Sequence, residues 1–105
     1  MRNFIEGYDE LEKKLGYEPN FHDDKIENIT ITKDNIVFVL RTVDDVLYNL
    51  IFEDVEDIDL KGKMRGIIGI IFEIEVKQNA GKLNSIIGPS LGIYAEIISK
   101  KIIVK

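Results

Sequence analysis

The chain has 105 residues, a formal net charge of −5 and no cysteine. This length predicts a single domain spanning residues 1–105, because most domains contain about 100–150 residues. The lack of cysteine excludes disulfides, iron–sulfur clusters, cysteine-based zinc fingers and thiol nucleophiles. Apolar residues make up 45% of the sequence and charged residues 31%, which is typical of a folded globular domain rather than a disordered chain.

Residues 3–15 are predicted to form a helix. The apolar side chains that recur there with the spacing i, i+4, i+7 and i+11, on one helix face, are Phe4, Tyr8, Leu11 and Leu15. Asn3 followed three residues later by Glu6 is a capping-box pattern at the start. Gly16 is a typical residue just past the C-terminus of a helix, so the helix is expected to end there.

From residue 26 onward the apolar period changes to two, which predicts strands. The predicted strands are 29–32, 36–40, 46–52, 55–60, 68–76, 83–87, 91–98 and 102–104. Phe72, Ile74 and Val76 are expected to face the core, and Pro89 marks an edge or a break. Short connections between successive strands favour antiparallel pairing. We predict an α+β domain that is mostly β: one N-terminal helix, then an antiparallel sheet or small sandwich of seven or eight short strands.

Acidic residues are concentrated in the first part of the chain. Residues 1–59 carry sixteen Asp and Glu against six Lys and Arg, whereas residues 60–105 carry three against eight. The seven acids that lie between Arg41 and Lys61, with no base among them, are Asp44, Asp45, Glu53, Asp54, Glu56, Asp57 and Asp59. Such a stretch repels nucleic acid and attracts basic proteins. The alternative is a solvated rim whose charges alternate with core residues.

Candidates for catalysis are few. His22 is the only histidine, which excludes sites that need two. It stands in the run His22-Asp23-Asp24, which could contribute to a metal site, although a structural turn is the favoured interpretation. No serine lies in the G-x-S-x-G pattern of a nucleophile elbow. We therefore expect no enzyme activity, no cofactor and no metal.

The segments 16–26, with its Phe21-His22-Asp23 step into a strand, 52–62 and 100–104 resemble the immunity protein 50 family of bacterial polymorphic-toxin systems. Residues 52–62 are similar to that family's F-x-x-V-x-x-L-x-L-x-G segment. The resemblance implies a non-enzymatic protein that binds and neutralises a cognate toxin. Phe21, His22 and Asp23 are the matching positions, and the resemblance assigns them no role.

If the partner is a basic toxin, the acidic stretch from Asp44 to Asp59 is the expected contact surface, with Tyr48 or Tyr94 as an aromatic anchor. The alternative is a β-rich interaction or small-ligand module, homodimeric through an exposed edge strand. No apolar stretch reaches the ~20 residues of a membrane-spanning helix, and residues 1–6 lack the apolar core of a signal peptide. We expect a cytoplasmic protein without a membrane partner.

Overall fold

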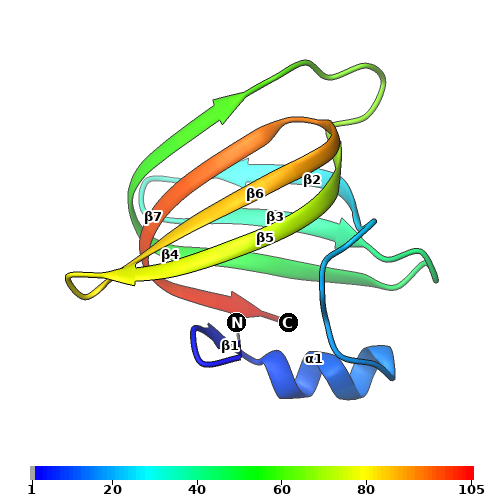
Figure 1. Cartoon of the computed structure of the whole chain (residues 1–105), viewed down its shortest axis with the longest axis horizontal. Helices are drawn as coiled ribbons and strands as arrows, with labels where there is room; N and C mark the ends of the chain where they lie inside the picture. Colours follow the sequence, from blue (N-terminus) through cyan, green and yellow to red (C-terminus); the bar gives the residue numbers. More distant parts are fainter. Residues whose placement is uncertain (1) are drawn as a thin grey trace.

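The computed structural model describes residues 2–105 and places one helix and seven strands within them. In chain order these elements are β1 (Ile5–Glu6), α1 (Tyr8–Leu15), β2 (Lys25–Ile31), β3 (Ile36–Arg41), β4 (Leu47–Lys61), β5 (Gly69–Asn79), β6 (Lys82–Gly92) and β7 (Tyr94–Val104) (Figure 1). The prediction of a mostly β domain with a single N-terminal helix is confirmed.

The strands form one sheet that closes on itself. Their order is β1-β7-β4-β3-β2-β5-β6, and β6 also pairs with β7. Six strands therefore make a ring, built from the two meanders β2-β3-β4 and β5-β6-β7. All pairs in the ring are antiparallel, while β1 adds to β7 in parallel. A closed sheet leaves few edges, which is one way in which β proteins avoid unwanted pairing.

β4 is one bent strand of 15 residues where the sequence predicted two. Asp54 has a φ of 53°, and the pairing with β7 shifts register between Val55 and Asp57. A bulge of this kind bends the strand and increases its twist. The first half of β4 therefore pairs with β3, while the second half leaves β3 and pairs only with β7.

β6 and β7 are also longer than predicted. β6 continues through Gly88 and Pro89, and β7 continues through Ser99 to Lys101, where a tight turn was expected. β6 pairs with β7 only from Leu83 to Ile87, so Pro89 lies where β6 has a partner on one side alone. Proline is tolerated there because no ladder hydrogen bond is needed from its nitrogen.

The core fills the inside of the ring. Residues paired across neighbouring strands point to the same face of a sheet, so the inward positions form continuous rows. The largest fully buried side chains are Phe21, Phe38, Phe52, Ile26, Ile36, Leu40, Leu50, Ile71, Ile87, Ile97, Ile102 and Val104. All but Phe21 come from the strands of the ring.

The helix begins at Tyr8, five residues later than predicted. Ile5 and Glu6 instead pair with Ile102 and Ile103 of β7, because pairing buries Ile5 in the core. Gly7 connects this strand to the helix with a φ of 80°, and a Cβ atom there would lie 2.2 Å from the carbonyl oxygen of Val104. Glycine is required at this close approach, which explains a residue that is unfavourable inside a helix.

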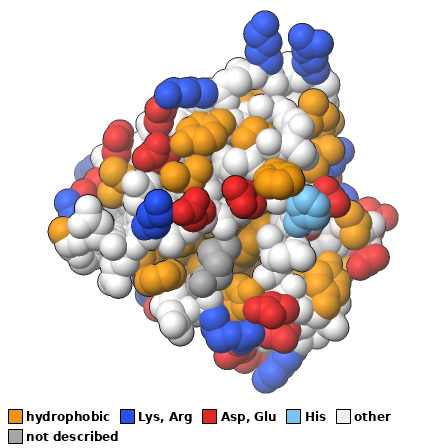
Figure 2. Space-filling model, viewed as in Figure 1, with side chains coloured by type: hydrophobic (Ala, Val, Ile, Leu, Met, Phe, Trp, Pro, Cys, Tyr) orange, Lys and Arg blue, Asp and Glu red, His pale blue; other side chains and the backbone are white. Residues whose placement is uncertain are grey.

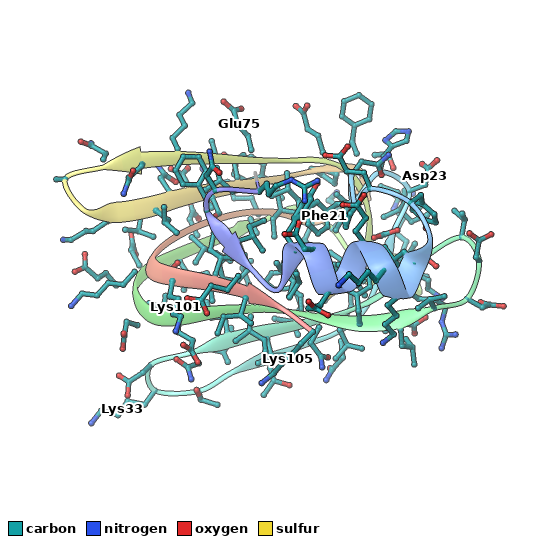
Figure 3. All side chains as sticks on the ribbon, turned by 90° about the horizontal axis from the view of Figure 1, so that it is seen from below. Phe21, Asp23, Lys33, Glu75, Lys101 and Lys105 are labelled. Carbon is teal, nitrogen blue, oxygen red and sulfur yellow. The ribbon has the colours of Figure 1, made fainter. Side chains whose placement is uncertain are left out.

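α1 lies across one open side of the closed sheet. Figure 3 views the molecule from this side and shows the helix between the β5–β6 hairpin and the strands β3 and β4. Tyr8 and Leu11, on the inner face of the helix, are buried, and the Tyr8 hydroxyl donates a hydrogen bond to the carbonyl of Pro19. Helix and connector together therefore seal this end of the core.

Candidate functional site

The predicted acidic residues do not form one surface. Asp44 and Asp45 lie in the turn between β3 and β4, where Asp45 contacts Arg41 at 3.6 Å. The other five acids lie on the second half of β4 or at its bend, at the far end of the same long strand. The structure therefore brings together five of the seven predicted positions, namely Glu53, Asp54, Glu56, Asp57 and Asp59.

Tyr48 is not available as a surface anchor, contrary to the sequence-based expectation. Only 2% of this residue is exposed, because it occupies an inward position on β4 opposite Leu40. Its hydroxyl donates a hydrogen bond to the carboxylate of Asp24. Tyr94, the other candidate, is partly exposed on β7, where its hydroxyl lies 3.4 Å from Glu96. Of the two tyrosines, only Tyr94 can thus act as an aromatic contact.

A ridge of carboxylates follows the second half of β4. We call Asp34, Asp54, Glu56, Asp57 and Asp59 the acidic ridge. Asp34 belongs to it because the β2–β3 turn packs against the bend of β4, where the amide of Val55 donates to the carbonyl of Asp34 at 2.8 Å. The Asp54 amide also lies 3.4 Å from the side-chain oxygen of Asn35. Sequence reasoning missed Asp34 because this contact depends on the bend.

Two lysines, one on β6 and one at the end of β4 itself, neutralise only part of the acidic ridge. Lys82 contacts Glu56 at 2.6 Å, and Lys61 contacts Asp59 at 3.3 Å. Within residues 2–105, Asp34, Asp54 and Asp57 make no ion pair, and all three are exposed. The ridge therefore presents free negative charge at its Asp54 end, where the β2–β3 turn meets β4.

An apolar groove of about 380 Å³ opens beside the acidic ridge, and we call it the mouth. Its lining residues are Ile29, Ile31, Leu60, Lys61, Gly62, Met64, Ile68 and Ile93. Ile29 and Ile31 pair with buried residues of β3 and so face inward, yet Ile31 is 55% and Met64 63% exposed. The inside of the closed sheet is therefore open to solvent here, on a scale typical of a ligand pocket.

The mouth exists because β2 and β5 separate. β2 pairs with β3 along its length but with β5 only at Lys25 and Ile26. The outer edge of β2 from residue 27 to 31 therefore has no strand beside it. Gly92 at the end of β6 has a φ of 91°, and a Cβ atom there would lie 2.2 Å from the Ile68 carbonyl oxygen. This close approach brings Ile93 to the floor of the mouth.

Basic residues surround the opposite end of the mouth from Asp34 and Asp54. The end of β4 and the connection that follows it carry Lys61, Lys63 and Arg65, and no acid occurs from residue 60 to residue 72. Figure 2 shows basic side chains projecting where Figure 1 places this connection. We call residues 61–66 the basic loop. Lys63 and Arg65 make no ion pair with the part of the chain that the structure describes.

We call the junction between β2 and β5 the seam. The segment before β2 contacts β5 there, and it holds the three positions that match the family motif, Phe21, His22 and Asp23. Phe21 is 1% exposed and fills the core below α1. The amide of Asp23 donates to the carbonyl of Ile71 at 2.8 Å, and the amide of Ile71 donates to the carbonyl of Asp24 at 2.9 Å. These bonds extend the short β2–β5 ladder, so Phe21 and Asp23 have a structural role.

His22 adds a side-chain contact to the same seam. Its Nδ1 lies 2.8 Å from the carbonyl oxygen of Phe72, and its ring packs edge-on against the Phe72 ring at 5.4 Å. Nε2 lies 3.5 Å from the Asp23 carboxylate. Residues 2–105 contain no group of three or more His, Cys, Asp and Glu side chains placed to hold a metal ion. The geometry around His22 therefore favours the structural turn.

Asp24 is the one carboxylate buried in this region. Burial raises the pKa of the Asp24 carboxyl above its ordinary value of 3.8, the hydrogen bond from Tyr48 opposes that rise, and the charge of Asp23 adds to it. Burial and the neighbouring Asp24 likewise raise the pKa of the Tyr48 hydroxyl, which stays protonated and donates. The pair lies inside the seam and stabilises a buried charge, so it belongs to the fold.

Comparison with known proteins adds a fold and no function. No family model matches the sequence, and no curated protein matches it. The chain is similar in structure to an uncharacterized protein from Neisseria gonorrhoeae, with a TM-score of 0.64 and 15% sequence identity over 81% of this chain and 92% of that one. The single helix found in residues 2–105 is too short and too polar to cross a membrane.

Proposed function

We propose that this chain is a non-enzymatic, immunity-type protein that binds and neutralises a basic protein toxin through the acidic ridge. One observation carries the proposal: Asp34, Asp54 and Asp57 come from two segments, are exposed, and make no ion pair within residues 2–105. The resemblance of residues 16–26 and 52–62 to the immunity protein 50 family supports the same function.

The charge of the acidic ridge suits a partner that acts on nucleic acid. Toxins of that kind carry basic surfaces, and an acidic inhibitor can occupy the place of the substrate's phosphates. Complementary charge raises association rates by about 10–1,000-fold, and the gain falls as ionic strength rises. Exposed Ile31 and Leu60 lie beside the ridge and supply the apolar contact that a stable interface needs at its centre.

The proposal is tested by identifying the partner and then removing the charge. Tagged protein captures its partner from a native lysate, and the captured protein is expressed alone and with this chain. Neutralisation predicts that the captured protein stops growth when alone and that co-expression restores growth. Rescue by wild type but not by the D34K/D57K variant supports the acidic ridge.

The matched control is the E10K/E73K variant, which changes net charge equally but alters exposed acids on α1 and β5. It is expected to rescue growth like the wild type. If D34K/D57K also rescues and binds as well as the control, the acidic ridge is not the binding surface. A captured protein that does not affect growth would contradict the immunity function itself.

A second candidate, a self-associating or ligand-binding β-rich module, is favoured by a different observation. The mouth exposes Ile31, Leu60 and Met64 around one apolar groove. Exposed apolar patches bounded by polar residues mark interaction sites. This candidate requires no toxin and predicts that the purified protein alone associates or binds an apolar ligand.

A further inference from the structure

The two ends of the mouth carry opposite charge. Ile31 lines one end and stands three residues before Asp34, which contacts the bend of β4 at Val55. At the other end Lys61 and Met64 line the groove within the basic loop. Asp54 and Lys61 stand seven residues apart on β4, and because the bulge between Val55 and Asp57 takes up one residue, this segment spans about 20 Å at ~3.3 Å per residue. The groove thus runs from an acidic end to a basic end.

β2 runs along the same direction. Its Ile26 pairs with Gly69, next to the connection that carries the basic loop, and its Ile31 precedes the β2–β3 turn, which carries Lys33 and Asp34. Between these points the outer edge of β2, residues 27–31, lacks a strand partner. An unpaired edge offers backbone donors and acceptors to another strand. Edge, groove and both charged ends therefore lie along one line.

We propose that the mouth binds a second copy of this chain, related by a two-fold axis that passes through β2 near Ile29. Such an axis turns the acidic end of one copy toward the basic end of the other, so that Asp34 and Asp57 face the partner's Lys63 and Arg65. It also places the two free β2 edges antiparallel. A two-fold interface must be self-complementary, and a groove with opposite charges at its two ends meets this requirement.

The apolar side chains fit the same arrangement. Ile31 and Met64 are among the most exposed large apolar residues of the chain, and they stand near opposite ends of the mouth. The two-fold axis brings Ile31 of one copy toward Met64 of the other. Both side chains then leave water on association, which supplies apolar contact that charge alone does not.

This inference does not rest on the proposed function. Both use Asp34 and Asp57, so a basic toxin and a second copy would compete for these carboxylates. The two proposals separate experimentally because self-association is measured on the purified protein alone. Substitution of Met64, which the proposed toxin contact does not use, changes the apolar lining of the mouth without altering the free charge of the acidic ridge.

The test is sedimentation velocity across micromolar to millimolar protein, with a charge swap. In the K63E/R65E variant both ends of the mouth are acidic, and in the D34K/D57K variant both are basic. Each alone should associate about tenfold or more weakly than wild type, because like charges would meet across the axis. An equal mixture should form a heterodimer at least as tight as the wild-type dimer, a result that unfolded variants cannot give.

The apolar contact is tested with an aspartate at Ile31, with Leu91→Asp as the matched control. Ile31 is 55% exposed and Leu91 is 51% exposed, but only Ile31 lines the mouth. Ile31→Asp should leave the protein monomeric, while Leu91→Asp should associate like the wild type. A wild type that stays monomeric throughout, or charge-swapped variants that do not associate when mixed, would overturn the proposal. A monomer that binds an apolar fluorescent probe in the mouth would assign the groove to a small ligand instead.

Discussion

The two ends of the closed sheet have similar apolar linings but differ in what covers them. At the closed end, α1 and its connector bury Tyr8, Leu11 and Phe21 against the strands. At the mouth, Ile31 faces the inside of the same sheet and Met64 of the basic loop lines the groove, yet both remain more than half exposed. The difference shows that inward orientation and burial are separate properties, and that the second depends on a covering segment. An end without cover is the natural place to look for a partner.

The largest expected effect is a loss of stability when the core is disrupted at the closed end. Phe21→Ala should lower the free energy of unfolding by about 3–5 kcal/mol, because it leaves a cavity that the surrounding core cannot fill. Phe72→Ala removes the same atoms from a side chain that is 53% exposed and should cost far less. Ile31→Ala, at the mouth, should stay within about 0.5 kcal/mol. Urea denaturation of the three variants measures the ranking, and equal losses would show that the two ends are equally packed.

A smaller effect is expected inside the seam of the closed end. Tyr48→Phe removes the hydroxyl that donates to the buried Asp24 carboxylate. An unpaired buried acceptor costs about 1–3 kcal/mol, and more when it is charged. Tyr94→Phe is the control, because that hydroxyl is only partly buried beside Glu96. Denaturation at neutral pH should show a lower free energy of unfolding for Tyr48→Phe and almost no change for Tyr94→Phe. The reverse order would contradict the role of Tyr48.

The smallest effect is a change in how stability depends on pH. Since the pKa of Asp24 is raised in the folded state, the folded protein binds more protons than the unfolded chain between the ordinary value of 3.8 and the raised value. The free energy of unfolding contributed by this group therefore falls as pH rises through that window. Asp24→Asn does not titrate, so its stability relative to wild type should increase from about pH 4 upward and then level off. A difference that is flat with pH would show that Asp24 titrates normally.

The sequence predicts element types well and register poorly. The alternation of apolar residues places the strands, and the single helix follows from Tyr8 and Leu11 on one face. Phe72, expected in the core, is instead 53% exposed, because β5 shifts register on both sides of Ile71. A one-residue shift moves a side chain to the other face of the sheet. No local pattern reveals such bulges, which depend on how the partner strand bends.

The candidate site was predictable only in part, for the same reason. The acidic residues on the second half of β4 are contiguous in sequence, so their clustering was visible. Asp34 joins them through the bend at Asp54, and Tyr48 is lost to the core because β4 is in register with Leu40 of β3. Predicting the mouth would require knowing that β2 separates from β5 after Ile26, and this separation depends on the tertiary structure.

The construction of the ring from two meanders has a consequence for the order in which the chain folds. Within each meander the strands are joined by short turns and can pair early, because closing a short loop costs little entropy. The pairings that complete the ring join distant residues, such as Leu50 with Val104 and Ile26 with Gly69. Long-range pairing is slow, so we expect folding in milliseconds to seconds. Until closure each meander exposes its outer strands, and the charged side chains along β2 and β4 then protect the chain from aggregation.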